Sequence, residues 1–354
     1  MQAAYPPLPR SLEEWGHQNL HDMDLLFQEV LANCERWQSL RSFFLEKGYY
    51  LYDAQSNLSH TPHRSNQLRR EIKPEYPFAR KFYQTDEELV FDAQSLLVWA
   101  ATDLKGREVV IKVVSDANPS DELDVLQFLN TKEARADPRN RTIPVIEFLE
   151  LEQYTFAVMP RWGDPTGATF DTVHEIMQFA LQLLEAFDFL HDNRIIHFDF
   201  LEQNTAMNAI YVARDNLRLP GLRKVQDTRY ALIDFGESKR YPRDIPLEDV
   251  RDNKRYLFKR RRVPVLEYPY NPFAVDVCGF AKVLERWVRH IEGFVPALGP
   301  FFDAMTAQNV EERLSAQQAL IQFQNIYSYL SEEQLGQKIN TMTWEEGILR
   351  YYDV

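Results

Sequence analysis

Cysteine is scarce in this chain, and long apolar runs are missing. Only two cysteines, Cys34 and Cys278, occur in 354 residues. That scarcity argues against a disulfide framework or a cysteine-built metal site and suits a reducing compartment. No run of about 18 apolar residues exists, so we expect no membrane span and no membrane partner. Residues 1–20 contain Pro, Glu and His where a signal peptide needs an apolar core. We therefore expect a cytoplasmic protein, with a nuclear location left open.

Positive charge is also in deficit. The 40 Lys and Arg residues against 53 Asp and Glu residues give a net charge of −13. Such a chain has little general affinity for a phosphate backbone, so we expect no nucleic-acid partner. The hydrophobic content of 45% is ordinary for a globular protein. A chain of this length can form two modest domains or one bilobal unit.

Apolar periodicity divides the chain into a strand-rich part and a helical part. We expect helical structure over residues 11–47, ended by Gly48, then a short strand at 49–52 and a polar connector over 53–75. Strands in the N-terminal part followed by helices in the C-terminal part indicate an α+β fold with a small β-rich lobe and a larger helical lobe. The patterns predict strands at 88–91, 95–102, 108–114, 143–149 and 155–159, and helices at 121–130 and 171–191.

Two motifs carry oxygen-bearing side chains at fixed spacing. The segment IIHFDFLEQNTAMN contains His197-x-Asp199-x-x-x-x-Asn204, and the later segment YALIDFG ends a short apolar strand with Asp234. Together they offer one candidate base and two metal-binding oxygens, which phosphoryl transfer requires. Each could instead be a loop or strand-end residue, but their order along the chain favours a site. We expect His197 to be a packing histidine rather than a catalyst.

A lysine lies upstream in the strand VVIKVV, at Lys112. In a β-branched run a lysine must either extend its amine to solvent or meet an anion. The two motifs downstream make it a candidate phosphate ligand rather than an edge-strand lysine. Glu122, at the start of a helix that Ser120 can cap, could orient the Lys112 amine through an ion pair. It could equally be a first-turn glutamate favoured by the helix dipole.

Over roughly residues 84–325 the chain resembles a eukaryotic protein kinase domain. The resemblance rests on the ordered set VVIK, E-L-x-V-L-x-x-L from Glu122, H-x-D-x-x-x-x-N, D-F-G and a D-V segment at Asp276. The helical leader and the segment YPYNPFAVD also resemble uncharacterised kinase-like proteins of mushroom-forming fungi. The expected domains are an N-terminal helical extension and connector, a kinase-like N-lobe, a kinase-like C-lobe and a tail on the C-lobe, at residues 1–83, 84–158, 159–325 and 326–354.

The resemblance implies ATP and Mg²⁺ as cofactors and assigns a role to each motif residue. Lys112 would hold the α- and β-phosphates, with Glu122 as its ion-pair partner. Asp199 would accept the proton of the acceptor hydroxyl. Asn204 and Asp234 would bind Mg²⁺. These roles agree with the residue chemistry, because a loose phosphoryl transfer needs positioning and charge neutralisation.

For the nucleotide base, the resemblance implies a set of lining residues along the lysine sheet and the segment after it. Val98 would follow the phosphate loop, and Met159 would lie near the gatekeeper position. Residues 160–162, including Arg161 and Trp162, would form the hinge that faces the adenine. The apolar spacing after Asp276 predicts a helix that begins at this residue, and the resemblance implies that Asp276 holds the backbone of the catalytic loop.

Further residues of the helical part have roles that the resemblance or the pattern implies. Arg313 would pair with Glu267 at the end of the activation segment. The basic run 259–262 is expected to be a solvated loop or a site for an anionic partner. The long spacing before Asp234 predicts a strand, an inserted loop and a second strand. Four residues, Trp344, Leu349, Tyr351 and Tyr352, are the expected anchors of the tail.

The chain also departs from the kinase pattern. No glycine occurs between Gly48 and Gly106, and Phe91, Ala93 and Leu96 stand where the phosphate loop would have glycines. Phe198 replaces the arginine that pairs with a phosphorylated activation loop, and Leu201 replaces a lysine near the γ-phosphate. Three functions stay open: a phosphotransferase acting on protein Ser/Thr, a nucleotide-binding or inactive pseudokinase that serves as a scaffold, and a small-molecule kinase.

Overall fold

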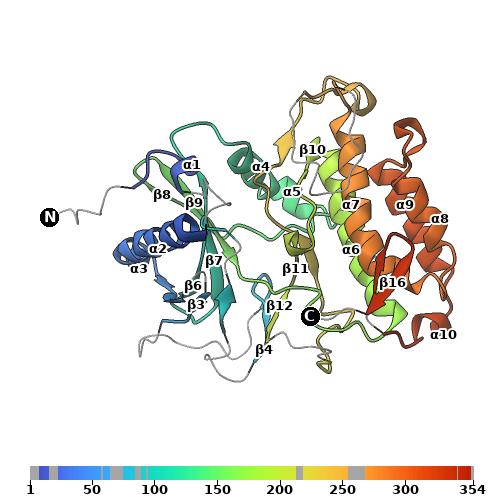
Figure 1. Ribbon diagram of the computed structural model, residues 1–354, viewed down its shortest axis with the longest axis horizontal. Coiled ribbons are helices and arrows are strands. Elements are labelled where there is room, and N and C mark those ends of the chain that lie inside the picture. Colours follow the sequence, from blue (N-terminus) through green and yellow to red (C-terminus); the bar gives the residue numbers. More distant parts are fainter. Residues whose placement is uncertain are drawn as a thin grey trace. The chain divides into compact units, whose positions relative to one another are not determined.

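The computed structural model describes nine stretches of the chain, which fall into two compact units (Figure 1). The described residues are 8–15, 23–56, 59–63, 75–83, 89–92, 95–212, 218–253, 268–340 and 342–351. The first unit consists of Met1–Leu123, Ile143–Gly163 and Asn208–Val212. The second consists of Asp124–Thr142, Asp164–Met207 and Ala213–Val354. No helix within the described stretches is long and apolar enough to cross a bilayer.

A five-stranded antiparallel sheet organises the first unit (Figure 1). Its strands, in spatial order, are β1 (Tyr49–Leu51), β6 (Val98–Asp103), β7 (Glu108–Ser115), β9 (Tyr154–Pro160) and β8 (Glu147–Leu151). The turn between β6 and β7 uses Gly106 at φ 76°, which suits a residue without a Cβ. The predicted sheet strands are confirmed with shifted ends. The exception is 143–149, where residues 143–146 lie outside any strand.

The helical leader covers one face of this sheet. Its helices are α1 (Leu12–Trp15), α2 (Met23–Ser39) and α3 (Arg41–Glu46), and residues 16–22 lie outside the described stretches. On β7, the alternate residues Val109, Ile111 and Val113 are fully buried in one apolar core with leader residues, among them Trp37. The Trp37 ring stacks on Trp99 of β6 at 5.7 Å between centroids. The leader therefore shares the hydrophobic core of the sheet.

Two smaller sheets complete the first unit. The strands β2 (Asp53–Ser56), β3 (Ser59–Thr61) and β5 (Phe91–Asp92) form one of them. The prediction of an irregular connector over 53–75 is therefore wrong at its start, because β2 and β3 pair as a hairpin. The strand predicted at 88–91 begins only at Phe91. In the other sheet, β4 (Arg80–Phe82) pairs in parallel with β12 (Ala209–Tyr211).

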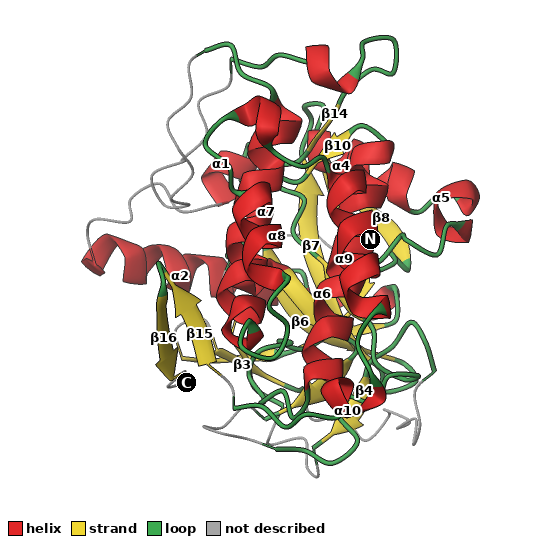
Figure 2. Ribbon diagram, turned by 90° about the vertical axis from the view of Figure 1, so that its right-hand side faces the viewer, coloured by secondary structure: helices red, strands yellow, loops and turns green. Residues whose placement is uncertain are grey.

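Helices dominate the second unit (Figure 2). The central one, α6 (Val173–Asp192), begins at Thr172, whose hydroxyl accepts a hydrogen bond from the Glu175 amide, and ends at Asn193. Its apolar residues are buried on several sides, which confirms the predicted helix. Around it and one another pack α7 (Pro272–Val288), α8 (Leu298–Met305), α9 (Ala316–Ser328) and α10 (Glu332–Leu335).

Short elements surround the two oxygen-bearing motifs of the second unit. The strands are β10 (Ile195–Ile196) paired with β14 (Lys239–Arg240), and β11 (Thr205–Met207) paired with β13 (Tyr230–Leu232). The strand, loop and strand order predicted before Asp234 is thus confirmed. Single 3₁₀ turns occur at η2 (Glu202–Asn204), η3 (Leu247–Asp249), η5 (Arg289–Ile291) and η6 (Val310–Glu312).

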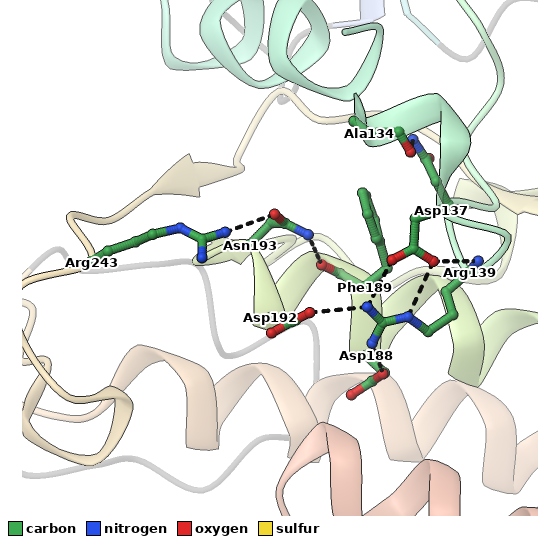
Figure 3. A network of polar contacts seen from close by, with 9 residues as sticks. Ala134, Asp137, Arg139, Asp188, Phe189, Asp192, Asn193 and Arg243 are labelled. Atoms are coloured by element: carbon green, nitrogen blue, oxygen red, sulfur yellow. Dashed lines mark hydrogen bonds and ion pairs between the residues drawn. The ribbon is translucent and has the colours of Figure 1, made fainter. Parts of the chain in front are cut away.

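An arginine after the helix predicted at 121–130 and the short helix that follows it is bonded to the C-terminal end of α6 (Figure 3). The predicted helix α4 (Asp121–Leu129) starts at Ser120, and an unpredicted short helix, α5 (Lys132–Ala136), follows it. Beyond α5, Arg139 pairs with Asp188 at 2.6 Å and with Asp192 at 2.9 Å. Two acidic side chains at the C-terminal end of α6, Asp188 and Asp192, therefore share the Arg139 guanidinium.

The tail forms a hairpin of β15 (Met342–Glu345) and β16 (Ile348–Tyr351). The inner strand packs on α7, and the Trp344 ring lies 4.8 Å from the Arg289 guanidinium. In the outer strand Leu349 is 47% and Tyr351 74% exposed, so the prediction that they anchor the tail is wrong. Tyr352 lies outside the described residues.

Candidate active site

A buried carboxylate in α7 holds the backbone of the predicted catalytic loop. Asp276, 1% exposed, accepts hydrogen bonds from the amide of His197 at 2.9 Å and the amide of Phe198 at 2.8 Å. The Nε2 atom of His191 lies 2.9 Å from the same carboxylate. A carboxylate tolerates such burial only when donors surround it. The implied role of Asp276 is thus present in the geometry, although the residue lies inside α7 and does not lead it as the sequence suggested.

His197 joins this loop to the end of β13. Its ring is fully buried, and burial lowers its pKa, so the imidazole is neutral near pH 7. The Nε2 atom donates to the carbonyl of Ile233 at 2.9 Å, and Nδ1 accepts from the amide of Asp199 at 3.3 Å. With both ring nitrogens satisfied, His197 is the packing histidine that the sequence predicted.

Asn204 holds the candidate base. Its amide nitrogen donates to the Asp199 carboxylate at 2.9 Å and to the Asp199 carbonyl at 2.6 Å. Asn204 itself is buried in η2, where its backbone N–H donates to the Leu201 carbonyl. Asp199 keeps a partly exposed side chain above this buried support. The loop therefore presents one carboxylate outward from a backbone that is fixed on its inner side.

The second motif lies directly beside the first in the same unit. The amide of Ile233 donates to the carbonyl of Asn204 at 2.9 Å, next to the β11–β13 ladder. Asp234 follows with an exposed side chain and a φ of 64°, and Phe198 has a φ of 65°. A left-handed backbone at a residue other than glycine costs on the order of 1 kcal/mol or more and concentrates at functional sites.

These two segments supply oxygen ligands suited to Mg²⁺. Asn204 uses its amide nitrogen for both bonds to Asp199, so its amide oxygen is the atom that could coordinate a cation. Asp234 adds a carboxylate from the adjoining segment. Mg²⁺ in nucleotide sites is held by one or two carboxylates together with water and phosphate oxygens. Within the described stretches no three His, Cys, Asp or Glu residues are grouped to hold a metal.

The first unit carries the candidate phosphate ligand. Lys112 on β7 and Glu122 on α4 form an ion pair with 2.5 Å between Nζ and Oε1, and their side chains are 9% and 11% exposed. The ion pair that the sequence left open is therefore present. Strand β7 fixes the start of the lysine side chain, and the first turn of α4 fixes the carboxylate that orients its amine.

Two of the predicted base-lining residues share the sheet face of Lys112. Val98 is directly opposite Lys112 on β6, and Met159 is directly opposite Val110 on β9. Since paired residues point to the same side and alternate residues along β7 do too, all four side chains lie on one face. The leader helices cover the opposite face. Val98 and Met159 are partly exposed.

The side chains of the hinge segment are bound inside the first unit. The Arg161 guanidinium donates to the Val90 carbonyl at 2.7 Å and lies 5.1 Å from the Phe91 ring. The Trp162 indole donates to the Pro77 carbonyl at 2.8 Å. The strand predicted to end at Met159 continues through Pro160, the first residue of the expected hinge. Both side chains are therefore hydrogen-bonded to backbone carbonyls of the first unit.

Several supporting residues were not found from the sequence. His191 and Ser238, whose hydroxyl donates to the His197 carbonyl at 3.1 Å, both brace the catalytic loop. For His191 the sequence offers one signal, a polar residue on the buried face of an apolar helix. Phe198, at the position of the missing arginine, packs in an apolar cluster with Val250, Tyr270 and Phe273.

The predicted pair between Arg313 and Glu267 could not be followed, because Glu267 and the basic run 259–262 lie outside the described residues. Arg313 is buried and donates to the carbonyls of Ala274 at 2.6 Å and Ala307 at 3.1 Å. Its observed contacts tie the start of α7 to the segment after α8.

Comparison with known proteins gives a distant and partial similarity. No protein-family model matches the chain. Over 150 residues the chain is 25% identical to the dual specificity protein kinase CLK2 of mouse (Mus musculus), and equally to that of human (Homo sapiens). The match covers 38% of this chain and 29% of each relative, so it spans less than a third of the curated relatives. This distant and partial similarity supports a kinase-like domain and nothing finer.

Proposed function

We propose that this protein is a kinase-like phosphotransferase that moves the γ-phosphate of ATP to a hydroxyl group, with protein Ser/Thr as the acceptor. The observation that carries the proposal is the hold of Asp276 on the His197 and Phe198 amides, together with the bond from Asn204 to Asp199. A polar support of this kind fixes a carboxylate for proton acceptance before substrate binds. The partial similarity to a protein kinase points the same way.

In this proposal Asp199 orients the acceptor hydroxyl and accepts its proton as the phosphoryl group arrives. Lys112 neutralises charge on the α- and β-phosphates, and Glu122 keeps the amine in place. Asn204 and Asp234 hold Mg²⁺, which would neutralise charge on the phosphate oxygens. Phosphoryl transfer depends mainly on positioning and charge stabilisation, so this set suffices for the chemistry.

The adenine would lie against the sheet face that carries Val98 and Met159. Because the Arg161 and Trp162 side chains are bound elsewhere, we propose that residues 160–162 contribute through their backbone. A backbone contact suits an adenine edge, which presents one donor and adjacent acceptors.

The test is transfer of labelled phosphate from ATP to a panel of Ser/Thr peptides by the full chain. Wild type should label peptides, Asp199→Asn should lose at least about a hundredfold in rate, and the exposed Asp244→Asn should match wild type. Equal background labelling by wild type and Asp199→Asn would refute catalysis on these substrates.

A second candidate is a nucleotide-binding scaffold without turnover. It is favoured by the segment around Phe91, which has no glycine and whose ring lies near the Arg161 guanidinium and the His60 ring. Thermal unfolding with and without Mg·ATP separates the two functions. A clear rise in Tm by ligand binding with no phosphate transfer would favour the scaffold, and no rise would exclude nucleotide sensing.

A further inference from the structure

A pocket of about 350 Å³ lies on the second unit between the loop 294–297 and the C-terminal half of α9. Its volume is at the lower end of the range found for ligand sites, about 300–1,000 Å³. That size suits one large side chain or a small molecule rather than an extended ligand. The apolar part of its lining includes Val295, Ile326 and Leu330. None of the residues proposed for phosphoryl transfer lines it.

Two aromatic rings at this pocket are in contact with water. Phe294 is 44% exposed and Tyr329 is 86% exposed. Ile321, 52% exposed, lies two helical turns before Tyr329 on the same face of α9, with the exposed Asn325 between them. Aromatic residues that flank a pocket are the usual anchors of polypeptide interfaces, because their burial contributes much at a low entropic cost.

The lining is also free of charge. All ten lining residues are described, and none is Asp, Glu, Lys or Arg, whereas at the chain average of 26% two or three would be expected. Gln322 and Asn325 add amide groups that can pair with a peptide backbone. On a chain of net charge −13, a partner here is selected by apolar fit and not by attraction between charges.

We propose that this pocket is a docking site for an uncharged, apolar segment of a partner polypeptide. One large aliphatic or aromatic side chain would enter the pocket beside Phe294 and Tyr329, and the amides of Gln322 and Asn325 would bind the adjoining backbone. The site is independent of the proposed phosphotransferase activity, since no residue of the two is shared.

The test is selection of a phage-displayed library of random 12-residue peptides on the full chain. The same library is selected in parallel on Ala297→Trp, which fills the pocket from an exposed position, and on Gln324→Ala, an exposed change on α9 outside the lining. Enriched peptides are then synthesised, and their binding is measured by fluorescence anisotropy on all three proteins and on Tyr329→Ala. Thermal unfolding verifies that each variant is folded.

We expect enriched peptides that contain an uncharged apolar core and bind wild type and Gln324→Ala equally. Ala297→Trp and Tyr329→Ala should each weaken binding by about tenfold or more. The proposal is overturned if no peptide is enriched, if the enriched peptides are charged, or if they bind the filled pocket as well as the open one. A further outcome in light scattering is that the chain self-associates and that Tyr329→Ala abolishes this self-association. That result would mean that a second copy of the chain occupies the pocket, and it would also overturn the proposal.

Discussion

The two units hold their site groups in opposite ways. In the second unit the candidate base lies on an irregular loop, and a buried network of Asp276, His197 and Asn204 fixes that loop through its backbone. In the first unit Lys112 lies on a paired strand, and the Glu122 carboxylate orients its amine. A strand receives its position from the ladder, whereas a loop must receive it from buried side chains.

The largest expected effect is on the second unit and comes from Asp276→Ala. The change removes the carboxylate that accepts from the amides of His197 and Phe198 and that lies 2.9 Å from Nε2 of His191. We expect the free energy of unfolding to fall by roughly 3 kcal/mol or more, as measured by urea denaturation. Asp244→Ala, at an exposed position, should change it by less than about 0.5 kcal/mol.

If Asp276→Ala cost no more than the exposed change, the buried network would not be what fixes the loop. The proposal that buried side chains fix the loop in the second unit would then be contradicted.

The next effect is a pH dependence of stability, to which a buried histidine of each unit contributes. Burial lowers the pKa of His60 in the first unit and of His290 in the second to about 4. The unfolded chain binds these protons near pH 6.5 and the folded chain does not, so unfolding becomes easier as pH falls from 6.5 towards 4. Each histidine can contribute at most about 3 kcal/mol.

Urea denaturation at pH 7, 5.5 and 4.5 measures this dependence. His60→Phe, which keeps a ring to stack on Trp99, should flatten it, and so should His290→Phe. An unchanged pH slope in either variant would show that the histidine titrates normally in the folded unit.

The third prediction concerns the simpler support in the first unit. Glu122→Gln removes the charge that orients Lys112 but leaves the β7 ladder intact. We expect a loss of stability of about 1 kcal/mol, clearly smaller than for Asp276→Ala, together with weaker Mg·ATP binding in calorimetry. A loss as large as that of Asp276→Ala would erase the proposed difference between strand and loop support.

The smallest effect is expected in the tail hairpin. Tyr351→Ser, at a 74% exposed position of the outer strand, should change the free energy of unfolding by less than about 0.5 kcal/mol. Trp344→Ala in the inner strand removes a ring that lies near Arg289 and should cost about 0.5–1 kcal/mol. Equal losses in urea denaturation would mean that both strands of the hairpin are packed.

Much of the fold was predictable because long periodic segments dominate it. The β-branched run of 108–114 and the helical spacing of 171–191 each correspond to a single element, β7 and α6. The strands β2 and β3 were not predictable, since their residues are polar and their pairing comes from each other. Helix α5 is too short and too polar to give a periodic signal.

The candidate site was predictable only where a motif fixes the spacing. Asp199 and Asn204 are five residues apart, and their contact follows from one turn of the chain. The hydrogen bonds from the amides of His197 and Phe198 to Asp276 span 79 and 78 positions of the sequence. No local pattern reveals such distant contacts without a family resemblance. The contact of Arg161 with the Val90 carbonyl links residues 71 positions apart, and no local pattern in the sequence indicates it.

Calorimetric titration of ATP into the full chain, with and without Mg²⁺, tests the central claim most directly. The account predicts Mg²⁺-dependent binding to wild type that weakens at least about tenfold in both Lys112→Met and Asp234→Asn, which alter one unit each. Absence of binding to wild type, or binding that both variants retain in full, would contradict it.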